Sequence, residues 1–174
     1  MSAFFESLAK RLADTWRMPA ERPAAGRRYR CQCGRPVFFR NSQCLGCQSP
    51  LGFVPERNTI CALTEVPFDR QFVVANDESN PRKRFRRCAN LNTPAACNWL
   101  VPVEDSFPLC PACRLNRTIP DLSVPENAIL WGRIEVAKRR LVAQLLELGL
   151  PVRSRVDDDT AAGLMFDFLR ATPG

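Results

Sequence analysis

The sequence predicts an α+β protein: two small cysteine-rich β modules, then a long amphipathic helix, with an extra helix at the N-terminus. Two observations support this fold class. Eight of the nine cysteines form two groups of four at metal-ligand spacings, and one long segment repeats apolar residues at steps of three and four. Fifteen prolines divide the 174 residues into short pieces, whose cores are small enough to need a metal or disulfides.

The first module is indicated by paired cysteines on two turns. Its four cysteines are Cys31, Cys33, Cys44 and Cys47. Gly34 lets the backbone turn beneath a metal, and segments 36–40 and 51–54 have the β-branched and aromatic content of short strands. Two turns that each offer two thiolates, with short strands between them, are typical of a zinc ribbon.

The second module has a tighter pair and a looser pair of cysteines. Its four cysteines are Cys88, Cys97, Cys110 and Cys113. Cys110 and Cys113 are separated by two residues, which is the spacing of a zinc knuckle, and the upstream pair would complete a tetrahedral site. Segment 99–101 is expected to be a core strand beside it. The sequence therefore predicts two zinc ions.

Disulfides are the competing interpretation of these cysteines. The segment that begins at Met1 lacks the basic flank, apolar run and cleavage site of a signal peptide. A reducing, cytoplasmic location is therefore expected, and it favours zinc thiolates over disulfides. The ninth cysteine, Cys61, is expected to be a small buried hydrophobe rather than a reactive thiol, since the sequence has no histidine to act as its base.

Four segments are predicted along the chain: 1–28, 29–80, 81–122 and 123–174. The first contains an amphipathic helix over residues 2–17, in which Phe5, Leu8, Leu12 and Trp16 recur at helical spacing, followed by a linker. We expect this helix to dock on its own domain or on a partner. Membrane-surface binding is less favoured, because acidic residues dilute its basic face.

The last segment is predicted to open with the long helix. Ser123 and Glu126 have the spacing of a capping box, with Pro125 in the first turn, and Gly149 and Pro151 end the helix. Its apolar stripe comprises Leu130, Ile134, Ala137, Leu141, Leu145 and Leu148. The cations at 138–140 are expected on its solvated face, and segment 164–169 begins another apolar element.

The charge balance points only weakly to an anionic partner. The formal charge is +7, but a zinc ion bound by four thiolates contributes −2, so two such sites lower it to +3. A basic run at 81–87 with one aromatic could follow a phosphate backbone, although such a run is more often a solvated edge or a docking surface. Its cations are Arg82, Lys83, Arg84, Arg86 and Arg87. No apolar run reaches the length of a membrane span.

Longer motifs over roughly residues 29–170 resemble a bacterial family of zinc-binding metallopeptidases with a zinc-ribbon domain. These motifs are CxCG…FFxNxxCxxC…LGFxP, RxCAN…ACNWLV, LCxxCRLNRTIPDL, ENxxLWxRxExAKRRLxxxLLxLGLP and GLxFDFL. The resemblance implies that the peptidase motif, a His-Glu-x-x-His helix, lies beyond these residues. Because this sequence has no histidine, no such site can be formed from it.

The sequence and the resemblance together predict that this chain is not itself an enzyme. It is expected to be a zinc-binding structural and interaction module, the non-catalytic N-terminal part of a metallopeptidase. Its expected partner is the C-terminal peptidase-like region or another protein. The alternative is a nucleic-acid-binding zinc-ribbon protein that uses the basic run 81–87.

Overall fold

The computed structural model describes residues 6, 29–155 and 163–170 of the chain. The predicted amphipathic helix over 2–17 and the linker after it lie outside the described residues, apart from Glu6. The described part has β-structure, one long α-helix and two four-cysteine clusters, so the predicted α+β class is confirmed.

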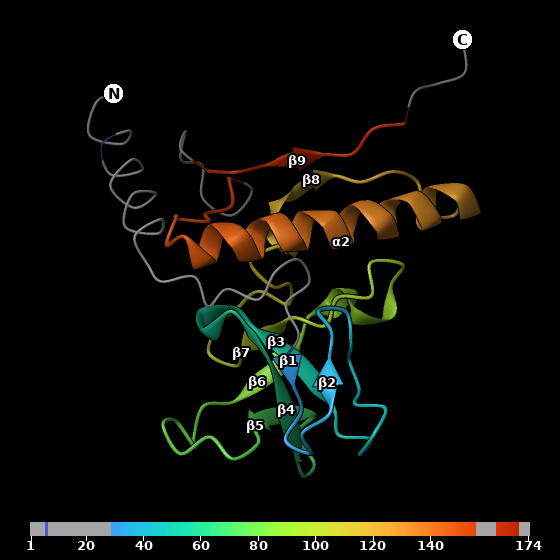
Figure 1. Cartoon of the computed structure of the whole chain (residues 1–174). Helices are drawn as coiled ribbons and strands as arrows, with labels where there is room; N and C mark the ends of the chain where they lie inside the picture. Colours follow the sequence, from blue (N-terminus) through green and yellow to red (C-terminus); the bar gives the residue numbers. More distant parts are fainter. Residues whose placement is uncertain (1–5, 7–28, 156–162, 171–174) are drawn as a thin grey trace.

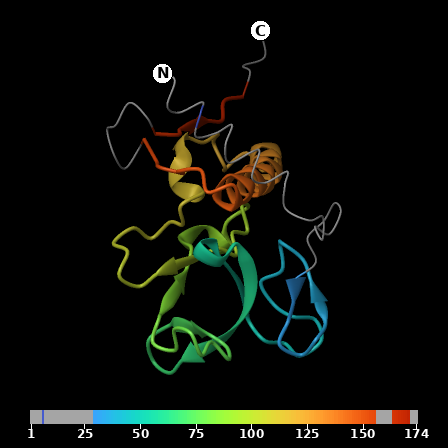
Figure 2. The ribbon, with the colours of Figure 1, turned by 60° about the vertical axis from the view of Figure 1, so that its left-hand side comes forward.

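A five-stranded antiparallel sheet forms the lower half of the molecule as drawn in Figure 1. Its strands follow in sequence order: β3 (Leu51–Val54), β4 (Thr59–Val66), β5 (Gln71–Val74), β6 (Phe85–Arg87) and β7 (Leu100–Pro102). The sheet curves so that its edge strands meet: Phe53 of β3 bridges Trp99 beside β7, and the Phe53 backbone N–H donates to the Asn98 carbonyl at 3.0 Å (Figure 2). This contact pairs edges that would otherwise be open. The sheet also takes strands from both sides of the predicted boundary at residues 80/81.

The first cysteine module is a small hairpin beside this sheet (Figure 2). Its strands β1 (Tyr29–Arg30) and β2 (Pro36–Val37) pair antiparallel, and β2 is shorter than the strand expected over 36–40. The returning strand expected over 51–54 is β3, which belongs to the five-stranded sheet. Short 3₁₀ turns complete the β part of the chain: η1 (Pro55–Arg57), η2 (Ala89–Asn92) and η3 (Cys113–Leu115).

Helix α2 (Pro125–Glu147) lies between the sheet and a second, two-stranded unit (Figures 1 and 2). That unit pairs β8 (Asn116–Thr118) with β9 (Phe166–Asp167) in parallel, and the side chains of Arg117 and Asp167 form an ion pair across it. The helix has the predicted length. No helix of the described residues is long and apolar enough to cross a bilayer.

Aromatic side chains join the two cysteine modules in one core. Phe53 stacks on Trp99 with ring centroids 4.4 Å apart, and Phe39 from the first module packs edge-on to Phe53 at 5.2 Å. The same buried cluster contains cysteines of both groups. Neither module therefore has a core of its own among the described residues.

The predicted capping box of the helix is wrong. Val124 occupies the N-cap position without a side-chain hydrogen bond, and α2 begins at Pro125. The Ser123 hydroxyl instead donates to the Asp121 carboxylate at 2.7 Å, because Asp121 already accepts from the Ser123 backbone N–H in a local turn. Pro125 tolerates this arrangement, since the first helical position has no intrahelical partner for an N–H.

The exposure of the helix faces also differs from expectation. Lys138 and Arg139 were expected in solvent but are only 4% and 2% exposed, whereas Arg140 is exposed as predicted. Several leucines and isoleucines of the apolar stripe face outward instead: Leu130 is 49% exposed, Ile134 41% and Leu141 45%. Lys138 and Arg139 therefore lie against the core of the protein beside the buried Trp131 and Val142, while part of the apolar stripe points to solvent.

Candidate metal centres

The four cysteines of the first module converge on one point. Their sulfurs lie within 4.8 Å of one another, with Cys31 and Cys47 at 3.5 Å and Cys33 and Cys44 at 3.7 Å. A zinc ion with four thiolates at about 2.3 Å needs sulfurs about 3.8 Å apart. All four are free thiols rather than disulfides. The group therefore has the donor set and the spacing to hold a zinc ion.

Two backbone turns place these sulfurs. The Gly34 N–H donates to the Cys31 carbonyl at 2.9 Å, with Gly34 at φ +81°, where glycine has no steric penalty. The Gln48 N–H donates to the Cys44 carbonyl at 2.9 Å in the other turn. Each turn brings its two cysteines to the same side, as the paired spacing predicts.

The first centre lies at the surface of the protein. Cys31 and Cys44 are buried, whereas Cys33 and Cys47 are exposed. The Ser49 hydroxyl lies 3.2 Å from Cys47 Sγ, and its hydrogen bond lowers the pKa of Cys47 to about 6. Burial raises the pKa of Cys31 to about 12. Because zinc binds thiolates, Cys47 is ready to coordinate at neutral pH, and Cys31 must release a proton to the solvent when the metal enters.

The second centre is enclosed on all sides. All four of its cysteines are buried, their sulfurs lie within 4.8 Å of one another, and Cys97 and Cys110 are 3.7 Å apart. The Cys110 N–H donates to Cys88 Sγ at 3.4 Å, and contact with Cys110 lowers the pKa of Cys88. The knuckle closes through the Cys113 N–H, which donates to the Cys110 carbonyl at 2.9 Å. This group also meets the requirements of a tetrahedral zinc site.

The long loop between Cys88 and Cys97 is held by its own hydrogen bonds. The Thr93 hydroxyl donates to the Asn90 carbonyl at 3.0 Å, and the Cys97 N–H donates to the same carbonyl at 3.0 Å. Turn η2 occupies the first half of the interval. The wide spacing of these two ligands is therefore bridged by an ordered turn.

A buried charged cluster on α2 contacts the second centre. The Glu135 carboxylate lies 4.0 Å from Cys113 Sγ and is fully buried. The Lys138 ammonium donates to Glu135 at 2.7 Å, and Arg139 approaches the same carboxylate at 3.9 Å. Asn116, which follows the knuckle, donates to Glu135 at 3.0 Å and accepts from Lys138.

This cluster explains why cations lie on the inner face of the helix. A filled four-thiolate site carries −2, and Glu135 adds a further negative charge beside it. Lys138 and Arg139 offset this charge in surroundings with little water. Groups that hydrogen-bond or balance the charge of metal ligands also fix the ligands' orientation. The same contacts attach α2 to the knuckle.

The residue pattern of α2 does not predict this role. Glu135 is spaced three and four residues before Lys138 and Arg139, which is the usual spacing of surface ion pairs on a helix. Nothing in that spacing distinguishes a buried cluster from a solvated one. The only available signal was the short distance in sequence between the knuckle and the helix.

The basic run 81–87 makes internal contacts through four of its five cations. Lys83 pairs with Glu56 at 2.5 Å and Arg84 with Asp69 at 3.3 Å. Arg86 donates to the Asp105 and Phe107 carbonyls, and Arg87 to the Leu51 carbonyl. For Arg82, the described part of the chain shows no such contact. Two of the five charges are therefore paired with carboxylates, and two guanidinium groups have donors engaged by backbone carbonyls. The role of the run stays a prediction.

Cys61 lies on β4, away from both centres. It is half-buried and packs against the cluster of Val54, Leu63, Phe85 and Leu100. Burial raises the pKa of its thiol. A protonated thiol among apolar side chains is consistent with the expected packing role.

Two family models match this chain. Residues 28–124 match a zinc-ribbon domain, and residues 127–174 match the family described as "Putative zinc-binding metallo-peptidase". The first match contains both cysteine groups, and the second contains nearly all of α2. The resemblance stated from the sequence motifs is confirmed by these matches.

Curated relatives include two mycobacterial proteins, each described as an uncharacterized protein. One is from Mycobacterium bovis and one from Mycobacterium tuberculosis, and both are 38% identical over 137 residues, or 79% of this chain. The chain spans about a third of their length, since the match covers 35% of each. No solved structure matches the chain.

The two centres should differ in what their loss destabilises. We expect two zinc ions in the native protein and one in each of the variants Cys44→Ser and Cys113→Ser. Only Cys113→Ser should lower amide protection along α2, by about tenfold or more, because Glu135 joins that centre to the helix. Metal analysis and hydrogen exchange measure both effects. Full protection of residues 125–147 in Cys113→Ser would contradict this assignment.

Lys138→Met should weaken zinc binding at the second centre. Removing the ammonium leaves Glu135 with one cation fewer beside a dianionic site, so we expect zinc affinity to fall by about 10- to 100-fold. Competition with a chromophoric chelator, in a Cys44→Ser background that leaves the second centre intact, measures this affinity. Arg133→Met is the matched control, since it removes one exposed cation from the same helix. Equal affinities in the two variants would refute the charge-balancing role.

Proposed function

Since the chain belongs to the zinc-ribbon domain family, we propose that it is a zinc-stabilised, non-catalytic module that presents helix α2 to a peptidase-like region. The observation that carries this proposal is the completeness of the two cysteine clusters. Each provides four protein ligands, and the second also anchors the helix through Glu135. In this proposal both metal sites stabilise the fold and neither is catalytic.

The absence of catalysis in this chain follows from the coordination chemistry. A hydrolytic zinc site keeps one position open for water and has a general base nearby. Four thiolates fill the tetrahedron, and their negative charge weakens the metal as a Lewis acid. The sequence has no histidine, so an imidazole-based site cannot be built from its own residues.

The interaction role is supported by the outer face of α2. We name the set Leu130, Ile134, Ala137, Leu141, Leu145 and Leu148 the apolar stripe. It extends for about 27 Å along the helix at 1.5 Å per residue. Its residues from Leu130 to Leu141 are exposed over about 17 Å, whereas Leu145 and Leu148 are half-buried. An exposed apolar surface on a long helix is typical of a binding interface.

The proposed occupant of the stripe is the remainder of the peptidase-like region. Residues 127–174 match the metallopeptidase family, so α2 falls within the peptidase-related segment rather than within the ribbon. About two-thirds of each mycobacterial relative lies outside the matched residues. A helix that packs its charged face on the ribbons and its apolar face on that remainder would join the two regions.

The zinc-loaded chain should not hydrolyse protein. We expect no chelator-sensitive release of peptides from unfolded casein, because neither centre has an open coordination position. Fluorescence of labelled casein measures this, with a commercial zinc protease as the positive control. Chelator-sensitive cleavage that is lost in Cys110→Ser would mean that the second centre is catalytic, and would overturn the proposal.

The apolar stripe should be needed for binding. Ile134→Glu with Leu141→Glu should lower, by tenfold or more, the affinity for the part of the M. tuberculosis relative outside the match, because charges would be buried without partners. Titration calorimetry measures the affinity. Phe68→Glu is the matched control, since Phe68 is exposed between β4 and β5, outside both α2 and the pocket beside it. If the double variant bound as tightly as the control, the stripe would not be the interface.

A further inference from the structure

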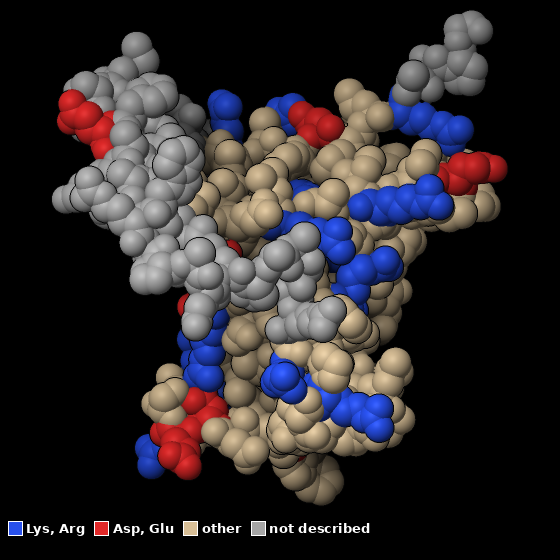
Figure 3. Space-filling view, in the orientation of Figure 1, with Lys and Arg blue, Asp and Glu red and all other residues tan. Residues whose placement is uncertain are grey.

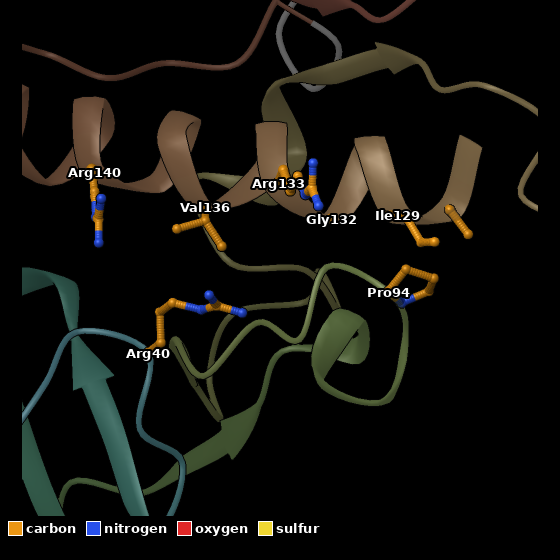
Figure 4. A pocket seen from close by; sticks show the side chains of 8 residues that line it. Arg40, Pro94, Ile129, Gly132, Arg133, Val136 and Arg140 are labelled. Carbon is orange, nitrogen blue, oxygen red and sulfur yellow. The ribbon is translucent and has the colours of Figure 1, made fainter. Parts of the chain in front are cut away.

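A groove of about 560 Å³ runs between α2 and the loops of the two cysteine modules (Figure 4). Val136 and Arg140 point from the helix toward the opposite wall, and Arg40 of the first module extends along that wall below Val136. Arg133 also lines the groove, close to the helix. Ile129 faces Pro94 at the other end. The groove is distinct from the apolar stripe, which lies on another face of the helix.

The groove is positively charged. Among the residues that the structure describes, its lining includes three arginines and no acidic residue. The described part of the chain offers Arg40, Arg133 and Arg140 no hydrogen bond or ion pair, in contrast to the cations of the basic run. In the space-filling view, Lys and Arg side chains gather over α2 and just below it, while Asp and Glu lie mostly toward the edges (Figure 3).

The walls of the groove are held at a fixed distance. A side chain at Gly132 would place its Cβ 2.5 Å from the Pro94 carbonyl oxygen, so glycine permits a close approach of helix and loop there. Arg139, on the inner face of α2, donates to the Ala95 carbonyl at 2.8 Å and attaches the same loop to the helix. The arginines are thus presented by elements that are already in place.

We propose that this groove binds an acidic polypeptide segment that carries apolar side chains. Guanidinium groups match carboxylates with paired hydrogen bonds, and three of them across one groove select for negative charge. Pro94, Ile129 and Val136 supply apolar contact between the charged positions. The helical part of the lining, from Ala128 to Arg140, extends for about 18 Å, which suits three turns of a helix or five to six extended residues.

The lining favours peptide over nucleic acid. Single-stranded nucleic acid is usually held by aromatic side chains on which bases stack, and none of the described residues that line this groove is aromatic. Phosphate backbones also require cations repeated along a track, whereas these three surround an apolar floor. Recognition of acidic motifs by clustered arginines and of amphipathic segments by grooves are both established modes of peptide binding.

The test begins with selection of peptides. A phage library of random 16-residue peptides is selected on the zinc-loaded full chain and depleted on the double variant Arg133→Glu/Arg140→Glu. We expect the enriched peptides to combine Asp or Glu with apolar residues. A synthetic peptide from this set should bind about tenfold more weakly to Arg133→Glu and to Arg140→Glu, and should weaken with added salt.

Matched controls separate this site from others. Arg82→Glu makes the same charge change at an exposed arginine outside the groove, and it should leave the peptide Kd within twofold. Ile134→Glu tests the apolar stripe and should also have no effect, so failure here is distinguishable from failure of the proposed function. Zinc content and circular dichroism confirm that each variant is folded.

Three results would overturn the proposal. The first is a selection that yields no peptide, or peptides without acidic residues. The second is binding that is equal in Arg133→Glu and the native chain. The third is a mixed-sequence single-stranded DNA that binds more tightly than the peptide and depends on the same arginines, which would make the groove a nucleic-acid site.

Discussion

Coordination of one metal by thiolates distant in sequence is the constraint on which the rest of this structure depends. The second cysteine group draws on residues from 88 to 113, and its sulfurs converge within 4.8 Å inside the core. The short strands around it have few residues with which to bury apolar surface. Small cores of this kind are rarely stable without a metal ion or a disulfide. The stacked pair of Phe53 and Trp99 then extends the same core to the first module. Metal, aromatic packing and sheet closure therefore act as one unit.

The position of α2 follows from the charge of that unit. A dianionic centre beside Glu135 needs nearby cations, and Lys138 and Arg139 can reach it only if their face of the helix turns inward. That rotation carries the leucines and isoleucines on the far side into solvent. The exposed apolar surface and the buried charges are thus two results of one orientation.

The sequence predicted local features well and tertiary ones poorly. Cysteine spacing identified both ligand groups, because a metal restricts which separations can close around it. The length of α2 followed from its periodicity and from Pro125 and Gly149. Periodicity could not identify which face of α2 is buried, since that depends on the contact between the helix and the second metal centre. The capping-box prediction was wrong for a similar reason. The Ser123 hydroxyl bonds to Asp121 instead of capping the helix, and residue spacing alone does not distinguish these two arrangements. The bridge between Phe53 of β3 and Trp99 beside β7 joins residues far apart in the sequence and has no local signature.

Because the two centres differ in exposure, an oxidant reaches the cysteine thiolates of one centre before those of the other. Cys33 and Cys47 present their sulfurs at the surface, whereas the second group is sealed inside the core. Zinc-bound thiolates are the species that peroxides oxidise, and access governs how fast they react. An oxidant therefore reacts first with the thiolates of the first centre and releases the zinc bound there. The second centre meanwhile keeps α2 attached. Damage would proceed from the periphery inward, with the helix the last element to lose its anchor.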